Sequence, residues 1–331
     1  MTIKMPNLPE AVKPAFIGFN TEFMQAYESR PRMWLTDDMI SIVNAGPEML
    51  TARFPIPLNQ AGYKRHEGEI RYRELSARYT DVGFEEWSDG VEEKLDTLMA
   101  IGSWIGWGDQ PRLMAQAAWL LEQQVVASAL EANAVLDWLG VTFFNAALPV
   151  NVITGLGGTQ SNILTAMTPS AANFDRISHA FRTMKGPDGQ YLGLEWIGIL
   201  TPPDLETAIE NILAPLTSGA VMQFTSGTED PHRYRGKKWF RQVPEFTDQT
   251  VYYAIGMSPR SVKPFAGMRK LAPASVNVMT GQVTMSGSDV ETFIHDKDHP
   301  KYENTGRVGI GKKKRFGALP ILPTHIIRCE V

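Results

Sequence analysis

YKRHEGEIRYRELSARYTDVGFEEWSDGVEEK, residues 63–94, is the stretch on which the interpretation of this chain depends. Fifteen of its 32 residues are Asp, Glu, Lys or Arg, too many for a buried core, yet five aromatic residues are spread along it. Alternation around Ile70 and Tyr72, with glycines at intervals, predicts a two-stranded extended ribbon with irregular tips. An isolated ribbon is marginally stable in water, so we expect it to need a partner surface. The alternative is a solvated hairpin of an ordinary domain.

The charges of this stretch separate by sign along its length. The first half is basic and the second half is acidic. Such a ribbon would be steered into register if each half met a surface of opposite charge. The side chains expected to contact that surface are Lys64, Arg65, Arg71, Tyr72, Arg73, Arg78, Glu85, Glu86 and Trp87.

Length and composition indicate a globular protein with a substantial core. The chain has 331 residues, of which 43% are hydrophobic and 21% are charged, enough for one large or two modest domains. A net charge of -4 gives no overall attraction to nucleic acid, so any contact with DNA would be local. Cys329 is the only cysteine, which excludes an intrachain disulfide and a cysteine-rich metal site.

No membrane segment is expected. The N-terminal residues lack the apolar block of a signal peptide, which predicts a protein that stays in the cytosol where it is made. Residues 138–174 carry no charge, but Asn, Pro and Gly interrupt them every few residues, so they are interpreted as buried or interfacial loop and strand.

The clearest regular element is a long helix over residues 109–139. Asp109 and Pro111 supply its start, apolar residues recur at alternating steps of four and three, and Gly140 ends it. A rise of 1.5 Å per residue would make it a spine of about 45 Å. Helices over 172–184 and 203–213 and a strand over 196–200 predict a compact α/β unit. Further strands are expected at 251–255, 276–278, 283–285, 291–294 and 321–329, which gives an α+β fold class.

Motifs for enzymatic chemistry are weak or absent. Residues 306–312 fit the first seven places of a phosphate-binding P-loop, but Lys313 stands where Ser or Thr would hold magnesium, and prolines prevent the helix that should follow. We therefore expect these glycines to serve strand connections and Lys312 to face solvent or DNA. His295 and His299, beside two aspartates, are better explained by a solvated loop than by a metal site. No catalytic residue, cofactor or metal is expected.

Two basic runs are candidates for contact with phosphate backbones, although solvated turns explain them as well. They are Lys312 to Arg315 and the set Arg233, Arg235, Lys237 and Lys238.

The order of these parts resembles the Hong Kong 97-type fold of tailed-phage major capsid proteins. The stretch YLGLEWIGILTPPDLETA, residues 191–208, is similar to the Gly-Leu-x-Pro strand of the Mu-type major head subunit, which runs into a helix carrying Leu-Glu-x-Ala. The ending DHPKY at 298–302, Gly306 and residues 309–316 also resemble capsid proteins of Mu-like prophages.

The resemblance implies a division of the chain and a role for each part. The expected parts are an N-terminal arm at 1–59, an extended E-loop at 60–97, a P-domain at 98–170 with the spine helix 109–139, an A-domain at 171–265 and return strands at 266–331. Pentamers and hexamers of such a subunit would tile an icosahedral shell around double-stranded phage DNA, with the E-loop lying across a neighbouring copy. The nine side chains named above would then make contacts between subunits.

The same resemblance implies partners and a place. A separate scaffold or protease, a portal protein and nonspecific contact with packaged DNA are expected, with assembly in the host bacterial cytoplasm and a final location in the virion capsid. Two alternatives stay open: an encapsulin-like nanocompartment shell, and a cytosolic α/β enzyme with a site near His295 and His299.

Overall fold

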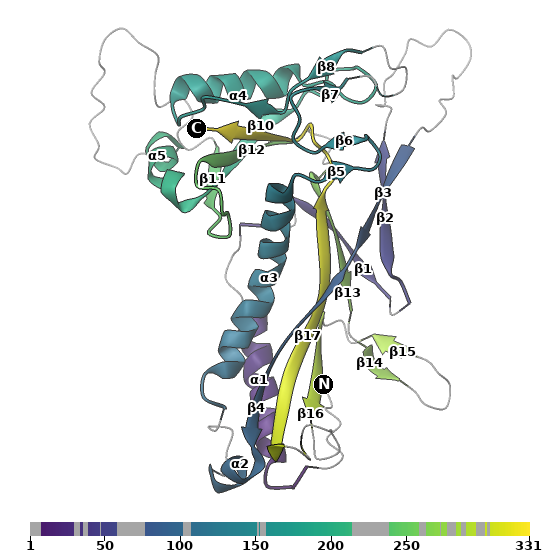
Figure 1. Ribbon diagram of the computed structural model, residues 1–331, viewed down its shortest axis with the longest axis vertical. Helices are drawn as coiled ribbons and strands as arrows, with labels where there is room; N and C mark the ends of the chain where they lie inside the picture. Colours follow the sequence, from purple (N-terminus) through teal and green to yellow (C-terminus); the bar gives the residue numbers. More distant parts are fainter. Residues whose placement is uncertain are drawn as a thin grey trace.

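The computed structural model shows an elongated molecule with a compact α/β unit at one end and a long sheet backed by two helices along the rest (Figure 1). It describes residues 8–29, 34–35, 39–46, 48–57, 77–101, 107–150, 152, 157–213, 238–257, 263–271, 273–276, 283–285, 289–295, 302 and 305–331, and the structural statements below concern these residues.

Two helices and a five-stranded sheet form the long part. Helix α1 (Lys13–Glu28) packs against helix α3 (Gln110–Ala132), and both lie beside the sheet. The sheet has the order β1 (Ile40–Ala45), β13 (Phe265–Lys270), β17 (Arg307–Pro320) and β16 (Val290–His295), and β4 (Glu85–Lys94) pairs with β17 as well. Helix α2 (Leu95–Ile101) follows β4, and β14 (Pro273–Val276) pairs with β15 (Val283–Met285).

Strand β17 is the longest strand of the sheet, and it joins the others together. It runs antiparallel to β4 from Arg307↔Lys94 to Phe316↔Glu85, and antiparallel to β16 and β13 on its other side. Its even-numbered residues from 308 to 320 are all buried. Because side chains alternate between the two faces of a strand, Val308, Ile310 and Phe316 belong to one buried face.

The compact unit is a second five-stranded sheet with the order β11 (Trp239–Gln242), β10 (Glu195–Thr201), β12 (Val251–Met257), β18 (Ile326–Glu330) and β9 (Ile163–Leu164). Helices α4 (Ala171–Thr183) and α5 (Pro203–Leu213) pack on one face through a core that includes Ile177, Phe181 and Ile209. Residues of α3 and of a short hairpin, β5 (Val135–Leu136) with β6 (Val141–Thr142), pack on the core of the other face. Strands β7 (Leu148–Pro149) and β8 (Thr159–Gln160) form a further small pair.

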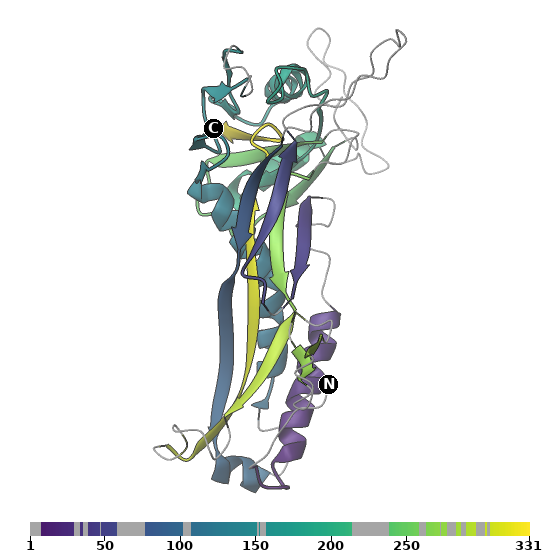
Figure 2. The same cartoon turned by 90° about the vertical axis from the view of Figure 1, so that its right-hand side faces the viewer.

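A separate two-stranded hairpin packs on the core beside the long sheet. Strand β2 (Thr51–Pro57) pairs antiparallel with β3 (Ala77–Gly83), in unbroken register from Thr51↔Gly83 to Pro57↔Ala77. Figures 1 and 2 place this hairpin on the side of the molecule away from α3.

Several predicted elements are confirmed. The helices expected at 172–184 and 203–213 and the strand at 196–200 correspond to α4, α5 and β10, and the strands expected at 251–255, 283–285 and 291–294 correspond to β12, β15 and β16. Of the strand expected at 276–278, Val276 ends β14 and the other two residues lie outside the described residues.

The predicted end of the spine helix at Leu139 is wrong, because α3 ends at Ala132. Asn133 adopts a left-handed conformation, with φ 47° and ψ 47°, which terminates the helix. Its side chain accepts a hydrogen bond from the Phe144 amide at 2.6 Å and donates one to the Phe144 carbonyl at 3.2 Å. The residues that continue the apolar pattern therefore form β5, which pairs with β6.

The predicted ribbon pairing within 63–94 is also wrong for its described part. Strand β3 pairs with β2, which precedes the stretch, and β4 pairs with β17 from the far end of the chain. The expected turn at 306–312 is instead the first half of β17, and the strand expected at 321–329 begins only at Ile326. Only Gly306, with φ +64°, lies in a connection.

Candidate assembly surface and buried charge network

Four of the nine predicted contact residues lie in described parts of the chain. Arg78 is exposed on β3 and donates a hydrogen bond to the Trp138 carbonyl. Glu85, Glu86 and Trp87 begin β4, where all three are exposed. The other five, Lys64, Arg65, Arg71, Tyr72 and Arg73, lie outside the described residues.

The acidic half of the ribbon meets basic side chains of its own chain. Glu86 forms ion pairs with Arg315 and, at 3.4 Å, with Lys313, both from β17. The hydrogen bond from Arg315 lowers the pKa of the Glu86 carboxyl. Glu92 lies 3.4 Å from the His295 ring. The basic surface expected on a neighbour for this half is therefore supplied, at Glu86, by β17 of the same chain.

A groove of about 870 Å³ opens between α3 and the bend where β3 turns into β4. Phe84 and Trp87 line it from the bend, and residues 316–319 of β17 line it from below. The α3 side of the groove is formed by Leu121, Gln124, Val125, Ser128, Ala129 and Ala132. Glu85 and Glu245 add two carboxylates.

This groove explains part of the apolar pattern of α3. Sequence periodicity placed Leu121, Val125, Ser128 and Ala132 on the buried stripe of the helix. The structure buries Leu121 but leaves Val125 half-buried and Ser128 and Ala132 exposed along the groove. The side that α3 buries carries Met114, Ala115, Glu122, Gln123, Val126, Ala127 and Leu130. One apolar strip of α3 is thus not covered by the described part of the chain.

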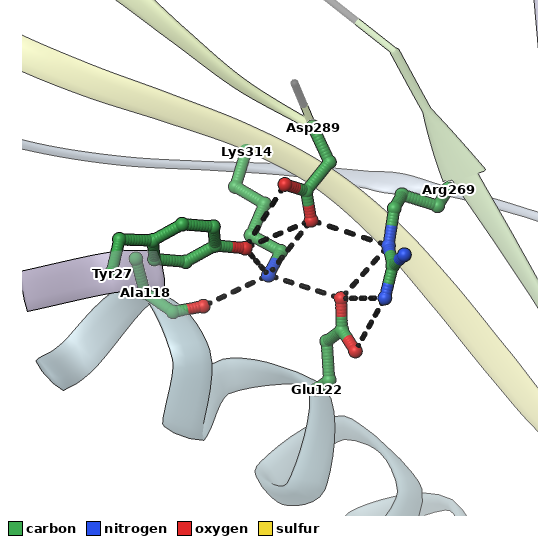
Figure 3. A network of polar contacts seen from close by, with 6 residues as sticks. All are labelled: Tyr27, Ala118, Glu122, Arg269, Asp289 and Lys314. Atoms are coloured by element: carbon green, nitrogen blue, oxygen red, sulfur yellow. Dashed lines mark hydrogen bonds and ion pairs between the residues drawn. The ribbon is translucent and has the colours of Figure 1, made fainter. Parts of the chain in front are cut away.

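A network of charged side chains lies between the helices and the sheet (Figure 3). The Lys314 ammonium on β17 lies 3.0 Å from a carboxylate oxygen of Glu122 on α3 and 3.2 Å from one of Asp289, just before β16. Arg269 on β13 donates to both Glu122 oxygens, at 2.8 and 2.9 Å, and lies 3.2 Å from Asp289. Two cations and two carboxylates thus face one another.

Helix α1 joins this network through one hydroxyl group. The Tyr27 hydroxyl lies 2.9 and 3.0 Å from the two Asp289 oxygens and accepts a hydrogen bond from Lys314 at 2.8 Å. Lys314 also donates to the Ala118 carbonyl of α3 at 3.0 Å. The network therefore connects α1, α3, β13 and β17 (Figure 3).

The surroundings favour the charged forms of Asp289 and Arg269. Burial alone would raise the pKa of Asp289, but Lys314 and Arg269 together hold it below the usual value. Burial likewise opposes the charge of Arg269, and Glu122 and Asp289 raise its pKa. Burial and the nearby Asp289 raise the pKa of Tyr27, so its hydroxyl stays protonated and donates to Asp289.

Lys312, two residues earlier on the same face of β17, has a different environment. It is 4% exposed, and it donates to the Asn20 side-chain oxygen on α1 and to the Thr292 hydroxyl on β16 at 2.8 Å. Its ammonium also lies 4.3 Å from the centre of the Phe23 ring. All three of these partners are neutral, and burial lowers the pKa of Lys312 to about 7.

These positions correct three expectations from the sequence. Lys312 does not face solvent or DNA, and Lys312 and Lys314 of the basic run Lys312 to Arg315 are buried. Gly311 serves close packing, because a Cβ atom there would lie 2.0 Å from the Phe293 ring. In the second basic run, Lys238 pairs with Glu195 at 3.1 Å, while Arg233, Arg235 and Lys237 lie outside the described residues.

A family model described as phage capsid protein matches residues 100–326, more than half of the chain. The chain belongs to this phage capsid protein family. The match runs from the end of α2 through the compact unit and β17 to the start of β18. The observed helices and strands confirm the expected α+β fold class, and the family model confirms a phage capsid protein. The role of this capsid protein is structural and its place is the virion capsid, which leaves the encapsulin-like alternative with less support.

Solved structures that match most of the length of this chain include capsids of other phages. The capsid protein is 12% identical to a chain of the bacteriophage JBD30 procapsid, covering 98% of this chain and 76% of that one with a TM-score of 0.49. It is 12% identical to a chain of Microbacterium phage Oxtober96 (91% and 92% covered, TM-score 0.48) and 9% identical to a virus-like particle from Pyrococcus furiosus (95% and 99% covered, TM-score 0.48). Because these TM-scores lie below 0.5, the assignment rests on the family model.

A search of curated proteins found no match. His299 of the alternative enzyme site lies outside the described residues, and among those described no group of three or more His, Cys, Asp or Glu side chains is placed to hold a metal ion. No helix in the described ranges is both long enough and apolar enough to cross a membrane.

Proposed function

We propose that this capsid protein is the repeating head subunit of a Mu-like phage, assembled as pentamers and hexamers into an icosahedral shell around double-stranded DNA. Its proposed parts are the N-terminal arm 1–59, the E-loop 60–97, the P-domain 98–170, the A-domain 171–265 and the return strands 266–331. The observation that carries the proposal is the β2–β3 hairpin on the side of the subunit away from α3. One face of it, including Ile56 and Val82, packs into the core of the subunit, and the other face, including Tyr79, is exposed. A neighbouring copy would provide a surface for the exposed face of the hairpin and for the charged segment that links its two strands.

The groove beside α3 is the proposed receiving surface for that arm. It combines apolar side chains, including Val125 and Trp87, with the carboxylates of Glu85 and Glu245. The residues that link β2 to β3 carry Lys64, Arg65, Arg71 and Arg73 together with Tyr63 and Tyr72. A basic and aromatic segment matches an apolar groove with an acidic rim in both charge and chemistry.

The remaining partners follow from the same proposal. A shell of this kind would be assembled in the bacterial cytoplasm with a scaffold or protease and a portal protein, and would touch packaged DNA without reading its sequence. Of the run Lys312 to Arg315, only Lys313 and Arg315 have side chains left partly exposed for such contact.

Particle formation by the full-length chain tests the proposal. We expect the wild-type protein to sediment as closed particles, visible by negative-stain microscopy, at high concentration or together with a scaffold partner. Trp87→Ala should abolish or deform the particles, because a buried aromatic anchor at an interface contributes about 2 kcal/mol or more. Met99→Ala, which trims an exposed apolar side chain on α2, is the matched control and should assemble normally. A wild-type chain that stays monomeric under all these conditions would contradict the proposal.

A further inference from the structure

Two helices of the compact unit expose side chains of opposite charge. On α4, Phe174, Ile177 and Phe181 face the core, while Arg176, His179 and Arg182 are exposed. On α5, Ile209 and Leu213 face the core, while Asp204 and Glu210 are exposed and Glu206 is half-buried. We call Arg176, His179 and Arg182 the basic face, and Asp204, Glu206 and Glu210 the acidic face.

These charges are not neutralised within the described part of the subunit. The Arg176 guanidinium donates only to neutral oxygens: the Asn173 side chain at 3.1 Å and the carbonyls of Thr165 and Ala166 at 3.3 and 3.4 Å. No ion pair joins any residue of either face to an oppositely charged side chain in the described ranges. Half-buried Asp175 lies at the edge of the basic face.

The helix dipole explains only in part why α4 exposes basic side chains and α5 exposes acidic ones. Asp204 and Glu206 lie in the first turn of α5 and Arg182 lies in the last turn of α4, positions that the helix dipole favours for these signs. Glu210, however, lies near the carboxyl end of α5, where the dipole disfavours an acid, and Arg176 lies in the middle of α4. A second cause is needed for the uniform sign of each face.

The two faces lie at the same end of the molecule but on different sides of it. Figure 1 shows α4 across the top of the compact unit and α5 on its left flank. Copies arranged in a closed ring touch head to tail, so each uses two different surfaces, and these surfaces must complement each other. Opposite charges on two different sides of one subunit meet that requirement.

We infer that the basic face on α4 of one copy docks against the acidic face on α5 of the next copy, forming a repeated head-to-tail contact between compact units within each ring. This inference rests on the proposed shell function. Because the faces are exposed, the contact would act mainly through steering and register, and it should weaken as salt rises.

Charge reversal of each face in the full-length chain tests the contact. His179→Glu with Arg182→Glu makes both faces acidic, and Glu206→Lys with Glu210→Lys makes both basic. We expect each variant alone to lose particle yield by about tenfold or more, because like charges would meet at every junction. Asp137→Lys reverses an exposed charge in the turn between β5 and β6 and serves as the control. Circular dichroism and thermal melting verify that each subunit folds.

Mixing the two variants gives the decisive measurement. An acidic copy alternating with a basic copy satisfies every junction of a six-membered ring but leaves one like-charged junction in a five-membered ring, so coexpression should restore hexamers. All four substitutions in one chain satisfy every junction of both rings and should restore particle yield. Normal assembly of either single variant, or no recovery in both the mixture and the fourfold variant, would overturn the inference while the wild type still assembles. A wild type that never associates would overturn the shell proposal and, with it, this contact.

Discussion

At the scale of residues, Lys312 and Lys314 show how one strand face accommodates a charge in two ways. Lys314 shares two carboxylates with Arg269, so its charge is balanced. Lys312 has only neutral oxygens and an aromatic ring as partners. Removing a charge from water without an opposite charge costs stability, and the lowered pKa of Lys312 expresses that cost.

Lys312 should therefore make stability depend on pH. Its pKa falls from an ordinary 10.5 in the unfolded chain to about 7 in the folded chain. Between these values the unfolded chain holds the proton and the folded chain does not, so the free energy of unfolding rises with pH, by up to about 1.4 kcal/mol per pH unit. We expect Lys312→Met to remove this rise, as measured by urea unfolding at intervals from pH 7 to pH 10.

Comparing the wild type with Lys312→Met isolates the effect of this residue on the pH dependence of stability, because the other groups titrate equally in both proteins. Lys312→Met also takes a partner from Asn20 and Thr292, a loss that does not vary with pH over this range. The predicted signature is thus a gap between the curves that changes with pH. Parallel curves would show that Lys312 keeps its proton in the folded chain.

Lys314, in contrast to Lys312, should stabilise the folded chain, because two carboxylates lie beside its ammonium group. Lys314→Met leaves Glu122 and Asp289 buried with Arg269 as their one remaining cation in the network, and breaking such a buried set costs about 3–5 kcal/mol. Lys313→Met on the same strand, where the side chain is partly exposed, should change stability by about 0–1 kcal/mol. Denaturant unfolding of both variants measures the difference, and equal losses would contradict the assigned role of the network.

At the scale of elements, the sequence pattern predicted the helices whose bounds depend on residues close by in the chain. Helices α4 and α5 carry amphipathic spacing with a capping residue or a proline at the start, and their bounds followed from the sequence. Strand β17 was missed because Lys312 and Lys314 occupy buried positions of its period-two pattern. The alternation of Val308, Ile310, Phe316 and Ala318 continues through them, and that was the available signal.

The carboxyl end of α3 was missed for a different reason, because it depends on a contact with the following hairpin. Asn133→Ala removes both hydrogen bonds to Phe144 and places an alanine in a left-handed conformation. We expect a loss of about 2–3 kcal/mol in the free energy of unfolding. Asn133→Gly loses the same hydrogen bonds but tolerates the conformation, so it should be the milder variant in thermal melts. A larger loss for glycine would contradict this account of the helix end.

At the scale of the whole molecule, sequence order predicted the capsid class but not how the charged stretch divides. The last ten residues of that stretch are β4, which pairs along its whole length with β17 and belongs to the body of the subunit. The other described part is β3, which forms the hairpin with β2. Composition alone could not separate them, because β4 is as charged as the basic half and Arg315, the partner of Glu86, comes from more than 200 residues away.

This division identifies a deletion that should separate folding from assembly. Removing residues 64–88 would take away β3 and the start of β4, and so disrupt the long sheet. Pro57 and Ala77 are paired across the hairpin, so an Asn-Gly turn in place of residues 58–76 can close β2 onto β3. We expect this variant to keep the circular dichroism and the melting temperature of the wild type while forming no closed particles. Normal particles would show that the arm makes no essential contact between copies, and an unfolded subunit would show that residues 58–76 belong to its own core.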